Sequence, residues 1–200
     1  MVYAIAKAAL DVLLAAFVLL VLAPVLALIA LAIWVQDPGA PVLFRQLRCG
    51  RGGRQFELLK FRTMVRDAEA LKEALRERSV VAWPDFRLPN DPRVTRLGRF
   101  LRRSSLDELP QLVNVLRGEM SLVGPRPTSF DAGTYELWQT GRLDFRPGIT
   151  GPWQVLGRGS MDFTERCRLE ISFFRRRSLA RELWLLVRTI PCVLRRTGVA

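Results

Sequence analysis

Residues 104–127 read SSLDELPQLVNVLRGEMSLVGPRP, in which the adjacent carboxylates Asp107 and Glu108 stand ahead of a rigid Pro-Arg-Pro turn. Proline lacks a backbone N–H and is tolerated only in the first turn of a helix, so Pro110 predicts a helix that begins between Ser105 and Asp107. The helix dipole stabilises a negative charge in that turn by about 0.3–1 kcal/mol. We therefore expect both carboxylates to be ionised.

Two interpretations of this carboxylate pair remain open on local sequence alone. Ser105 and Glu108 have the spacing of a capping box, which would make the acidic residues purely structural. Ionised carboxylates also suit a nucleophile or a ligand of a hard cation such as Mg²⁺, but they do not suit a general acid. Because successive residues of a helix point about 100° apart, Asp107 and Glu108 are expected to have different roles.

A carboxylate that attacks a phosphate needs cations beside it, because charge repulsion opposes the approach. Arginine offers a planar fork that suits bidentate phosphate binding. For each basic residue a solvated surface position is the alternative. The candidates, which stand at rigid turns or strand ends, are Lys60, Arg62, Arg126, Arg146 and Arg158.

Composition narrows the chemistry further. The chain contains no histidine, which excludes Ser-His-Asp and Cys-His catalysis and the histidine-containing metal sites. It contains no P-loop, no GxGxxG and no zinc motif. Three widely separated cysteines favour a reducing compartment over a disulfide framework. The net charge of +12, carried by residues 37–200, attracts phosphate groups of nucleic acid, lipid or nucleotide alike.

Residues 12–35 carry no charge and would form a helix of ~36 Å, enough for a hydrocarbon core of ~30 Å. We expect a retained membrane helix over 1–36 and a membrane-associated catalytic domain over 37–200. Pro24 predicts either a kink in a spanning helix or a break in a re-entrant one. Basic residues flank the segment on both sides, which favours the re-entrant form with both ends in the cytoplasm.

The remaining pattern predicts a mainly helical α+β fold. Strands over 42–47 and 55–61 are expected to pair as a hairpin around a Gly-Arg-Gly-Gly turn. The Pro- and Gly-rich residues 144–153 predict an ordered loop. Helices are expected over 65–78, 93–103 and 163–195. In the last of them apolar residues interleave with arginines, which favours a helix in the membrane interface; a helix packed on the core with a solvated basic face is the alternative.

These segments resemble the bacterial sugar transferase family, the monotopic polyprenyl-phosphate phosphoglycosyl transferases, in the short form that is little more than the catalytic domain. The central match is the 24-residue motif quoted above. Two positions depart from the family: Ala23 replaces the usual Ser before Pro24, and Glu170 replaces an Asp. The remaining matching segments are 44–46, 60–64, 91–95, 146–151, 154–155 and 157–158.

The resemblance implies transfer of a sugar-1-phosphate from a UDP-sugar to polyprenyl phosphate, usually undecaprenyl phosphate, with release of UMP at the start of a surface glycan pathway. It implies that Asp107 is the nucleophile and a Mg²⁺ ligand, that an aspartyl phosphosugar forms, and that Glu108 assists. It also implies a re-entrant helix on the cytoplasmic face of the bacterial inner membrane, with amphipathic helices at the interface. The residues it assigns to substrate phosphates are Lys60, Arg62, Arg126, Arg146 and Arg158.

A membrane-tethered nucleic-acid-binding protein is the alternative hypothesis, and it rests on the net charge of +12. Aromatic residues fall in apolar stripes rather than in stacking platforms, and no helix-turn-helix or RNP pattern is present. We therefore expect no nucleic-acid partner.

Overall fold

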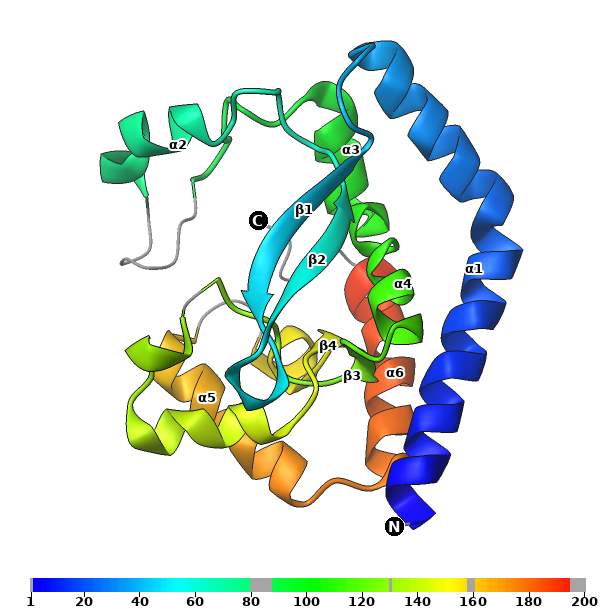
Figure 1. Cartoon of the computed structure of the whole chain (residues 1–200), viewed down its shortest axis with the longest axis vertical. Coiled ribbons are helices and arrows are strands. Elements are labelled where there is room, and N and C mark those ends of the chain that lie inside the picture. Colours follow the sequence, from blue (N-terminus) through cyan, green and yellow to red (C-terminus); the bar gives the residue numbers. More distant parts are fainter. Residues whose placement is uncertain (1, 80–87, 130, 158–160, 195–200) are drawn as a thin grey trace.

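The computed structural model describes residues 2–79, 88–129, 131–157 and 161–194 (Figure 1). It confirms a mainly helical chain with small sheets and one long apolar N-terminal helix. The helices are α1 Val2–Gln36, α2 Ala70–Ala74, α3 Arg96–Arg103, α4 Gln111–Leu116, α5 Phe163–Arg175 and α6 Leu179–Leu194. The strands are β1 Leu43–Cys49, β2 Gln55–Phe61, β3 Ser121–Val123 and β4 Gly148–Thr150. Short 3-10 or π turns lie at Arg51–Gly53, Arg76–Arg78, Leu106–Glu108, Ala132–Thr134, Leu137–Asp144 and Trp153–Gly157.

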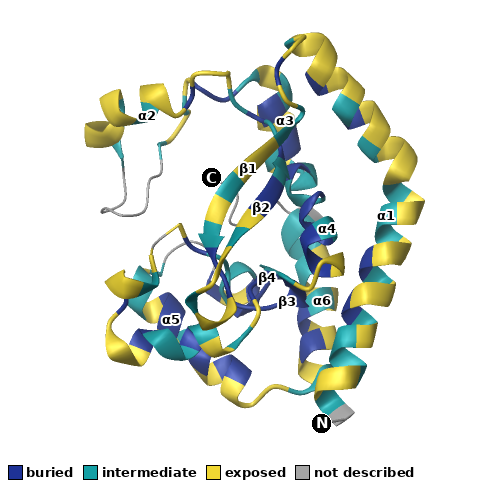
Figure 2. Cartoon of the chain, in the orientation of Figure 1, coloured by how far each residue is buried: buried dark blue, intermediate teal, exposed yellow. Residues whose placement is uncertain are grey.

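Helix α1 runs along one side of the molecule and remains helical through Pro24 (Figure 1). Among the described residues it is the one helix long and apolar enough to cross a membrane, with a mean hydropathy of 3.1 in its most apolar part, of which only 11% is buried. Its outer face is exposed along its length (Figure 2). It contacts the rest of the chain near both ends, through Asp11 and Ala15 at one end and Ile29 and Ile33 at the other.

The predicted hairpin is confirmed. Strands β1 and β2 pair antiparallel, from Leu43 opposite Phe61 to Cys49 opposite Gln55. Gly52 has a φ of 65°, a backbone conformation that residues with a side chain disfavour. The turn between the two strands therefore favours glycine at this position. Both Leu58 and Leu59 of β2 are buried. Because successive side chains of a strand point to opposite faces, the side chain of Lys60 lies on the other side of the strand from Leu59.

A second, parallel sheet of β3 and β4 was not predicted. Strand β4 lies within residues 144–153, which were expected to be an ordered loop, and β3 lies in the central stretch. The N–H of Ser121 donates to the carbonyl of Pro147 at 2.8 Å, and that of Gly124 donates to Thr150 at 3.0 Å. A Cβ on Gly124 would lie 2.2 Å from the carbonyl oxygen of Arg146, so only glycine permits this approach. The sheet therefore holds the segment that leads into the Pro-Arg-Pro turn.

Three apolar clusters join the elements around the central stretch. Ala15 of α1 packs with Leu58 of β2 and with residues of α4 and β3. Phe173 and Phe174 of α5 pack with Leu185 of α6. The remaining cluster comprises Ile29, Ile33, Phe61 and Leu101, which join the far end of α1 to β2 and α3.

Several helix predictions were wrong in extent. The helix expected over 65–78 is reduced to α2 and a 3-10 turn, and its Leu71 is 45% exposed. Helix α3 begins at Arg96 rather than residue 93, since the Thr95 hydroxyl caps it by accepting from the Gly98 N–H at 2.9 Å. The tail is two helices, α5 and α6, separated at residues 176–178.

Candidate active site

Asp107 and Glu108 lie in the 3-10 turn Leu106–Glu108, ahead of α4 rather than in its first turn. Pro110 is the residue that precedes α4. The predicted capping box is wrong, because Ser105 adopts a left-handed conformation with φ 57° and its side chain makes no capping hydrogen bond. The carboxylates are therefore free of a purely helix-capping role.

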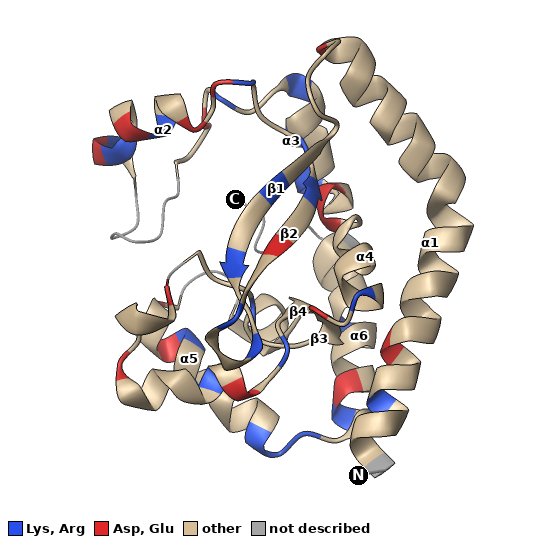
Figure 3. Cartoon of the chain, viewed as in Figure 1, with Lys and Arg blue, Asp and Glu red and all other residues tan. Residues whose placement is uncertain are grey.

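Glu108 joins two of the predicted cations. Its Oε1 accepts from Lys60 Nζ at 2.7 Å and from Arg126 Nη2 at 3.0 Å. These contacts bring together β2, the 3-10 turn and the Pro-Arg-Pro turn, and the acidic turn is seen beside a basic stretch of β2 in Figure 3. Burial alone would raise the pKa of Glu108, but Arg126 and Lys60 outweigh it and hold this pKa well below its usual range. Glu108 is ionised and orients two cations.

Asp107 has a different environment. Its side chain is buried, with 7% of the residue exposed, and no hydrogen-bond donor reaches its carboxylate among the described residues. Burial raises the pKa of Asp107 to about 6; the charge of Glu108 adds to the rise, whereas Lys60, Arg102 and Arg126 oppose it. The expectation that the helix dipole governs both carboxylates is wrong, because no α-helix begins at them. The two carboxylates therefore have distinct environments, and the prediction that their roles differ stays a prediction.

Arg102, near the end of α3, is a cation that sequence reasoning missed. Its Nε donates to the Thr63 hydroxyl at 2.9 Å. Burial lowers the pKa of Arg102, and the charge of Asp107 raises it. The residue stands in a run of arginines, so no local signal distinguishes it from its solvated neighbours; only the fold places it at Asp107.

The backbone of Arg126 is held on both sides by one buried ion pair. Its N–H donates to Glu170 Oε1 at 2.9 Å, and its carbonyl accepts from Arg142 Nη2 at 2.7 Å. The same Arg142 nitrogen lies 2.7 Å from Glu170 Oε2, and the two side chains are 3% and 0% exposed. This bracket fixes the main chain of the turn while the Arg126 guanidinium reaches Glu108. Arg142 was not predicted, and Glu170 was known only as a departure from the family.

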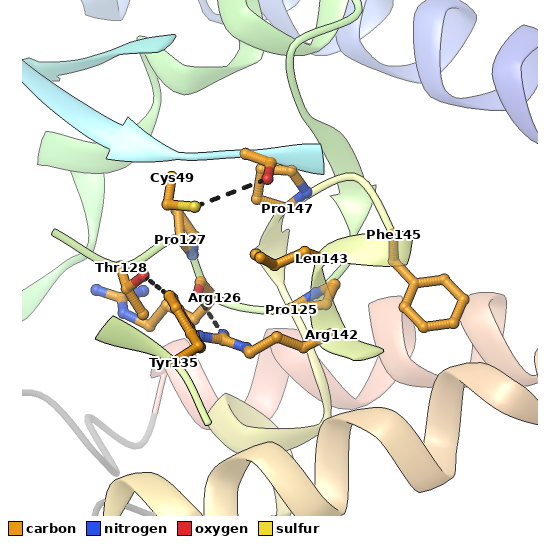
Figure 4. Close-up of a pocket in the computed structure, with 11 residues that line it drawn as sticks. Cys49, Pro125, Arg126, Pro127, Thr128, Tyr135, Arg142, Leu143, Phe145 and Pro147 are labelled. Carbon is orange, nitrogen blue, oxygen red and sulfur yellow. Dashed lines mark hydrogen bonds between the residues drawn. The ribbon is translucent and has the colours of Figure 1, made fainter. Parts of the chain in front are cut away.

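A small pocket adjoins the bracket, and Figure 4 shows Arg142 reaching the carbonyl of Arg126 within it. The hydroxyl of Tyr135 hydrogen-bonds that of Thr128, and the Thr128 carbonyl accepts from the Cys49 N–H at 3.0 Å. The lining contains neither Asp107 nor Glu108. We interpret it as part of the support for the turn rather than as the reaction centre.

The other predicted phosphate-binding residues lie elsewhere. Arg62 pairs with Asp37 at the junction of α1 and β1, with 3.1 Å between Nη1 and Oδ2. Arg146 is exposed and forms no ion pair among the described residues. Arg158 lies outside the described residues. Of the five, the structure thus brings Lys60 and Arg126 to the dyad, and phosphate binding by the other three stays a prediction.

No cluster of three or more metal-ligating side chains occurs in the described ranges. Mg²⁺, however, is commonly held by one or two carboxylates together with water and substrate phosphates. Asp107 is buried, and its carboxylate accepts no hydrogen bond from the described residues. Its oxygens are therefore the kind of ligand that such a site requires.

Comparison with known proteins identifies the chain. Residues 2–196 match the family described as "Bacterial sugar transferase". The exopolysaccharide production protein ExoY of Rhizobium meliloti is 39% identical over 94% of this chain and 85% of its own. The UDP-glucose:undecaprenyl-phosphate glucose-1-phosphate transferase of Caulobacter vibrioides is 43% identical, over 94% of this chain and 69% of its own. The undecaprenyl-phosphate galactose phosphotransferase of Salmonella typhimurium is 40% identical over 96% of this chain and 41% of its own.

The chain spans only 35–42% of the length of several relatives, among them the galactosyl transferase CpsE of Streptococcus agalactiae. The comparisons give no support to the nucleic-acid hypothesis. The match over almost every residue, together with the identity to ExoY, establishes one point: this chain belongs to the bacterial sugar transferase family.

Proposed function

We propose that this chain transfers a sugar-1-phosphate from a UDP-sugar to a polyprenyl phosphate of the undecaprenyl class and releases UMP, at the start of surface glycan synthesis. The observation that carries the proposal is the unequal dyad: a desolvated Asp107 without a hydrogen-bond donor in the described ranges, next to Glu108, which binds Lys60 and Arg126. The printed names of the Caulobacter and Salmonella relatives, both undecaprenyl-phosphate sugar transferases, support the substrate classes.

In the proposed reaction an Asp107 oxygen attacks the phosphorus that carries the sugar. The bond from that phosphorus to the oxygen bridging to UMP breaks, and UMP leaves with the electron pair. A phosphate oxygen of the lipid then attacks the same phosphorus and releases the Asp107 carboxylate. Lys60 and Arg126 offset the negative charge that develops, and Glu108 holds both of them in place.

Mg²⁺ is the proposed cofactor, and Asp107 would hold it together with the substrate phosphates. When bound, it supplies further charge neutralisation at the diphosphate. Within the protein, Glu108 is less suited to this role because its Oε1 already accepts from two cations.

We further propose that α1 is re-entrant and that the enzyme lies on the cytoplasmic face of the inner membrane. Supporting this, both ends of the helix contact the same unit: Asp11 bonds the N–H of Leu122 in β3 at 3.2 Å, and Ile33 packs with Phe61 and Leu101. The same unit packs along α1 from Asp11 to Ile33, so if the helix spanned the ~30 Å hydrocarbon core it would draw that unit into the bilayer. An apolar face on α6 supports membrane contact by that helix as well, and it consists of Leu183, Trp184, Val187 and Ile190, all exposed.

The test is a panel of UDP-sugars incubated with undecaprenyl phosphate, Mg²⁺ and the detergent-solubilised protein. We expect at least one sugar to give UMP and a lipid-linked sugar diphosphate, and we expect EDTA to stop both. An Asp107→Asn preparation of equal purity controls for contaminating hydrolases. Absence of UMP with every sugar, from protein that unfolds cooperatively, would contradict the proposal.

The first half of the reaction is predicted to slow in acid. Asp107 attacks only when ionised, and burial raises its pKa to about 6, so the ionised fraction grows as the pH rises through 6. At pH 5 the UMP burst should be about tenfold slower than its plateau above pH 7, since one pH unit below a pKa leaves about a tenth of the acid ionised. Rapid-quench measurement of UMP between pH 5 and 8 checks this. A rate that is flat over this range would show that Asp107 ionises at a lower pH or is not the nucleophile.

A further inference from the structure

A group of polar side chains, of which Asp11 and Glu182 are buried, fastens the start of α1 to the rest of the chain. Lys7 Nζ lies 2.6 Å from Asp11 Oδ1 and 2.9 Å from Glu182 Oε2 in α6. The Tyr3 hydroxyl donates to the other oxygen of Glu182. In Figure 3 the basic and acidic segments of α1 and α6 lie close together near the N-terminus. We call Tyr3, Lys7, Asp11 and Glu182 the N-terminal polar cluster.

Asp11 extends this cluster to β3. Its Oδ2 accepts from the Ser121 hydroxyl at 2.9 Å, and its Oδ1 accepts from the Leu122 N–H at 3.2 Å. Asp11 is only 4% exposed. Leu122 precedes Arg126 by four residues, and β3 runs directly into the Pro-Arg-Pro turn. The Asp11 carboxylate therefore connects α1 to β3, the strand that leads to Arg126, which is one of the two cations that Glu108 binds.

Joining α1 to β3 through buried charges costs desolvation free energy, which apolar contacts between the same elements would not cost. The neighbouring contacts of α1, such as Ala15 against Leu58 and Leu112, are apolar and non-directional. Such contacts alone leave an apolar helix able to shift or tilt along an apolar face. A charged pair with defined hydrogen bonds fixes one register, which is the best-attested use of buried polar groups.

We propose that Asp11 is a positioning residue for the second half of the reaction: by locking α1 to β3 it sets the depth in the bilayer at which the phosphosugar on Asp107 meets the lipid phosphate. This rests on the proposed function. The two substrates differ in how they reach the site. A UDP-sugar arrives from water and is indifferent to depth, whereas the lipid phosphate is confined by its tail to one level of the membrane.

The kinetic test compares the half-reactions in Asp11→Asn and in Glu182→Gln, each reconstituted in vesicles of phosphatidylethanolamine and phosphatidylglycerol. Asparagine loses the charge that pairs with Lys7 and replaces one acceptor oxygen by a donor nitrogen, so the two oxygens that accept from Ser121 and from Leu122 are no longer both present. Glu182→Gln removes an equally buried charge but leaves the contacts of Asp11 to β3 in place. It is the matched control.

For Asp11→Asn we expect a UMP burst without lipid within about twofold of the parent, but transfer to undecaprenyl phosphate slower by about tenfold or more, since displacement of about 1 Å costs up to about 10²-fold. Glu182→Gln should retain both half-reactions. Equal loss of both half-reactions in Asp11→Asn, or equal loss of transfer in the two variants, would overturn the proposal in favour of a merely structural cluster.

A second measurement does not depend on activity. A nitroxide is attached to a cysteine introduced by Arg117→Cys, at an exposed position in the turn before β3. The accessibility of the nitroxide to oxygen and to a nickel chelate reports the depth of this turn in the bilayer. Cys192 is replaced by serine so that it is not labelled, and Cys49 and Cys167 are buried. The probe should change depth in Asp11→Asn and not in Glu182→Gln. An unchanged depth overturns the positioning role even if UMP forms. Conversely, if neither the parent nor any variant forms UMP, the proposed function is refuted. The depth measurement then still tests whether Asp11 fixes the position of α1 relative to β3.

Discussion

Asp107→Asn is expected to abolish sugar-phosphate transfer, with a loss on the order of 10⁴-fold or more, as is found when a nucleophile is removed from an enzyme that forms a covalent intermediate. Asparagine preserves the shape of the side chain but has no anionic oxygen to attack phosphorus. Steady-state UMP release with saturating lipid measures this loss. Full activity in the variant would remove Asp107 from its assigned role.

The same substitution should make the protein more stable, whereas replacing a residue that serves only the fold would not stabilise it. The pKa of Asp107 is raised from 3.8 to about 6 by burial, so the folded state resists its ionisation more than the unfolded state does. This cost is absent below pH 3.8, grows as the pH rises and is complete above pH 6, where about two pKa units correspond to about 3 kcal/mol. Neutral asparagine avoids it.

Unfolding of Asp107→Asn and of the parent, followed by circular dichroism between pH 4 and 8, checks the sign. The variant should unfold at the higher temperature at pH 8, and the difference should shrink toward pH 4. Glu108→Gln is the matched neutralisation at the next position and should be destabilising instead, because it leaves Lys60 and Arg126 without their shared partner. Destabilisation by both variants would contradict the unequal dyad.

The second large effect is expected at the bracket. Glu170→Gln should destabilise the protein by about 3–5 kcal/mol, the usual result of leaving one member of a buried ion pair without its partner. Here the stranded residue is Arg142, whose side chain is 3% exposed. Because the Arg126 N–H also loses its charged acceptor, we expect turnover to fall as well, and denaturant unfolding and UMP release measure the two losses.

The double variant Glu170→Gln with Arg142→Met separates these losses. Replacing both partners removes the stranded charge and should recover much of the stability. It should not recover turnover, because the Arg126 carbonyl loses its donor too. Recovery of both would mean that the bracket serves stability alone and does not position Arg126.

Local chemistry was sufficient for part of this account. The hairpin follows from two β-prone runs around a glycine turn. The need of a phosphate-attacking carboxylate for cations predicted five candidates, of which Lys60 and Arg126 contact the dyad. The adjacent carboxylates differ in environment, because Glu108 faces two cations and Asp107 is buried without a hydrogen-bond donor in the described residues.

The parts that failed depend on contacts distant in the chain. Strands β3 and β4 are three residues each, and they pair where Gly124, Gly148 and Gly151 let two backbones approach. Arg142 and Glu170 look like ordinary charged surface residues in sequence; burial and their contacts to the N–H and carbonyl of Arg126 distinguish them. The capping box failed because a left-handed residue, here Ser105, cannot be inferred from residue type alone.

The central claim, that Asp107 carries the sugar-phosphate during transfer, is tested by incubating the protein with a reactive UDP-sugar and Mg²⁺ and no lipid. We expect a burst of UMP of about one per active enzyme and a phosphosugar adduct that tandem mass spectrometry places on Asp107. Addition of undecaprenyl phosphate should discharge the adduct. UMP that appears only after lipid is added, with no adduct at Asp107, would contradict it.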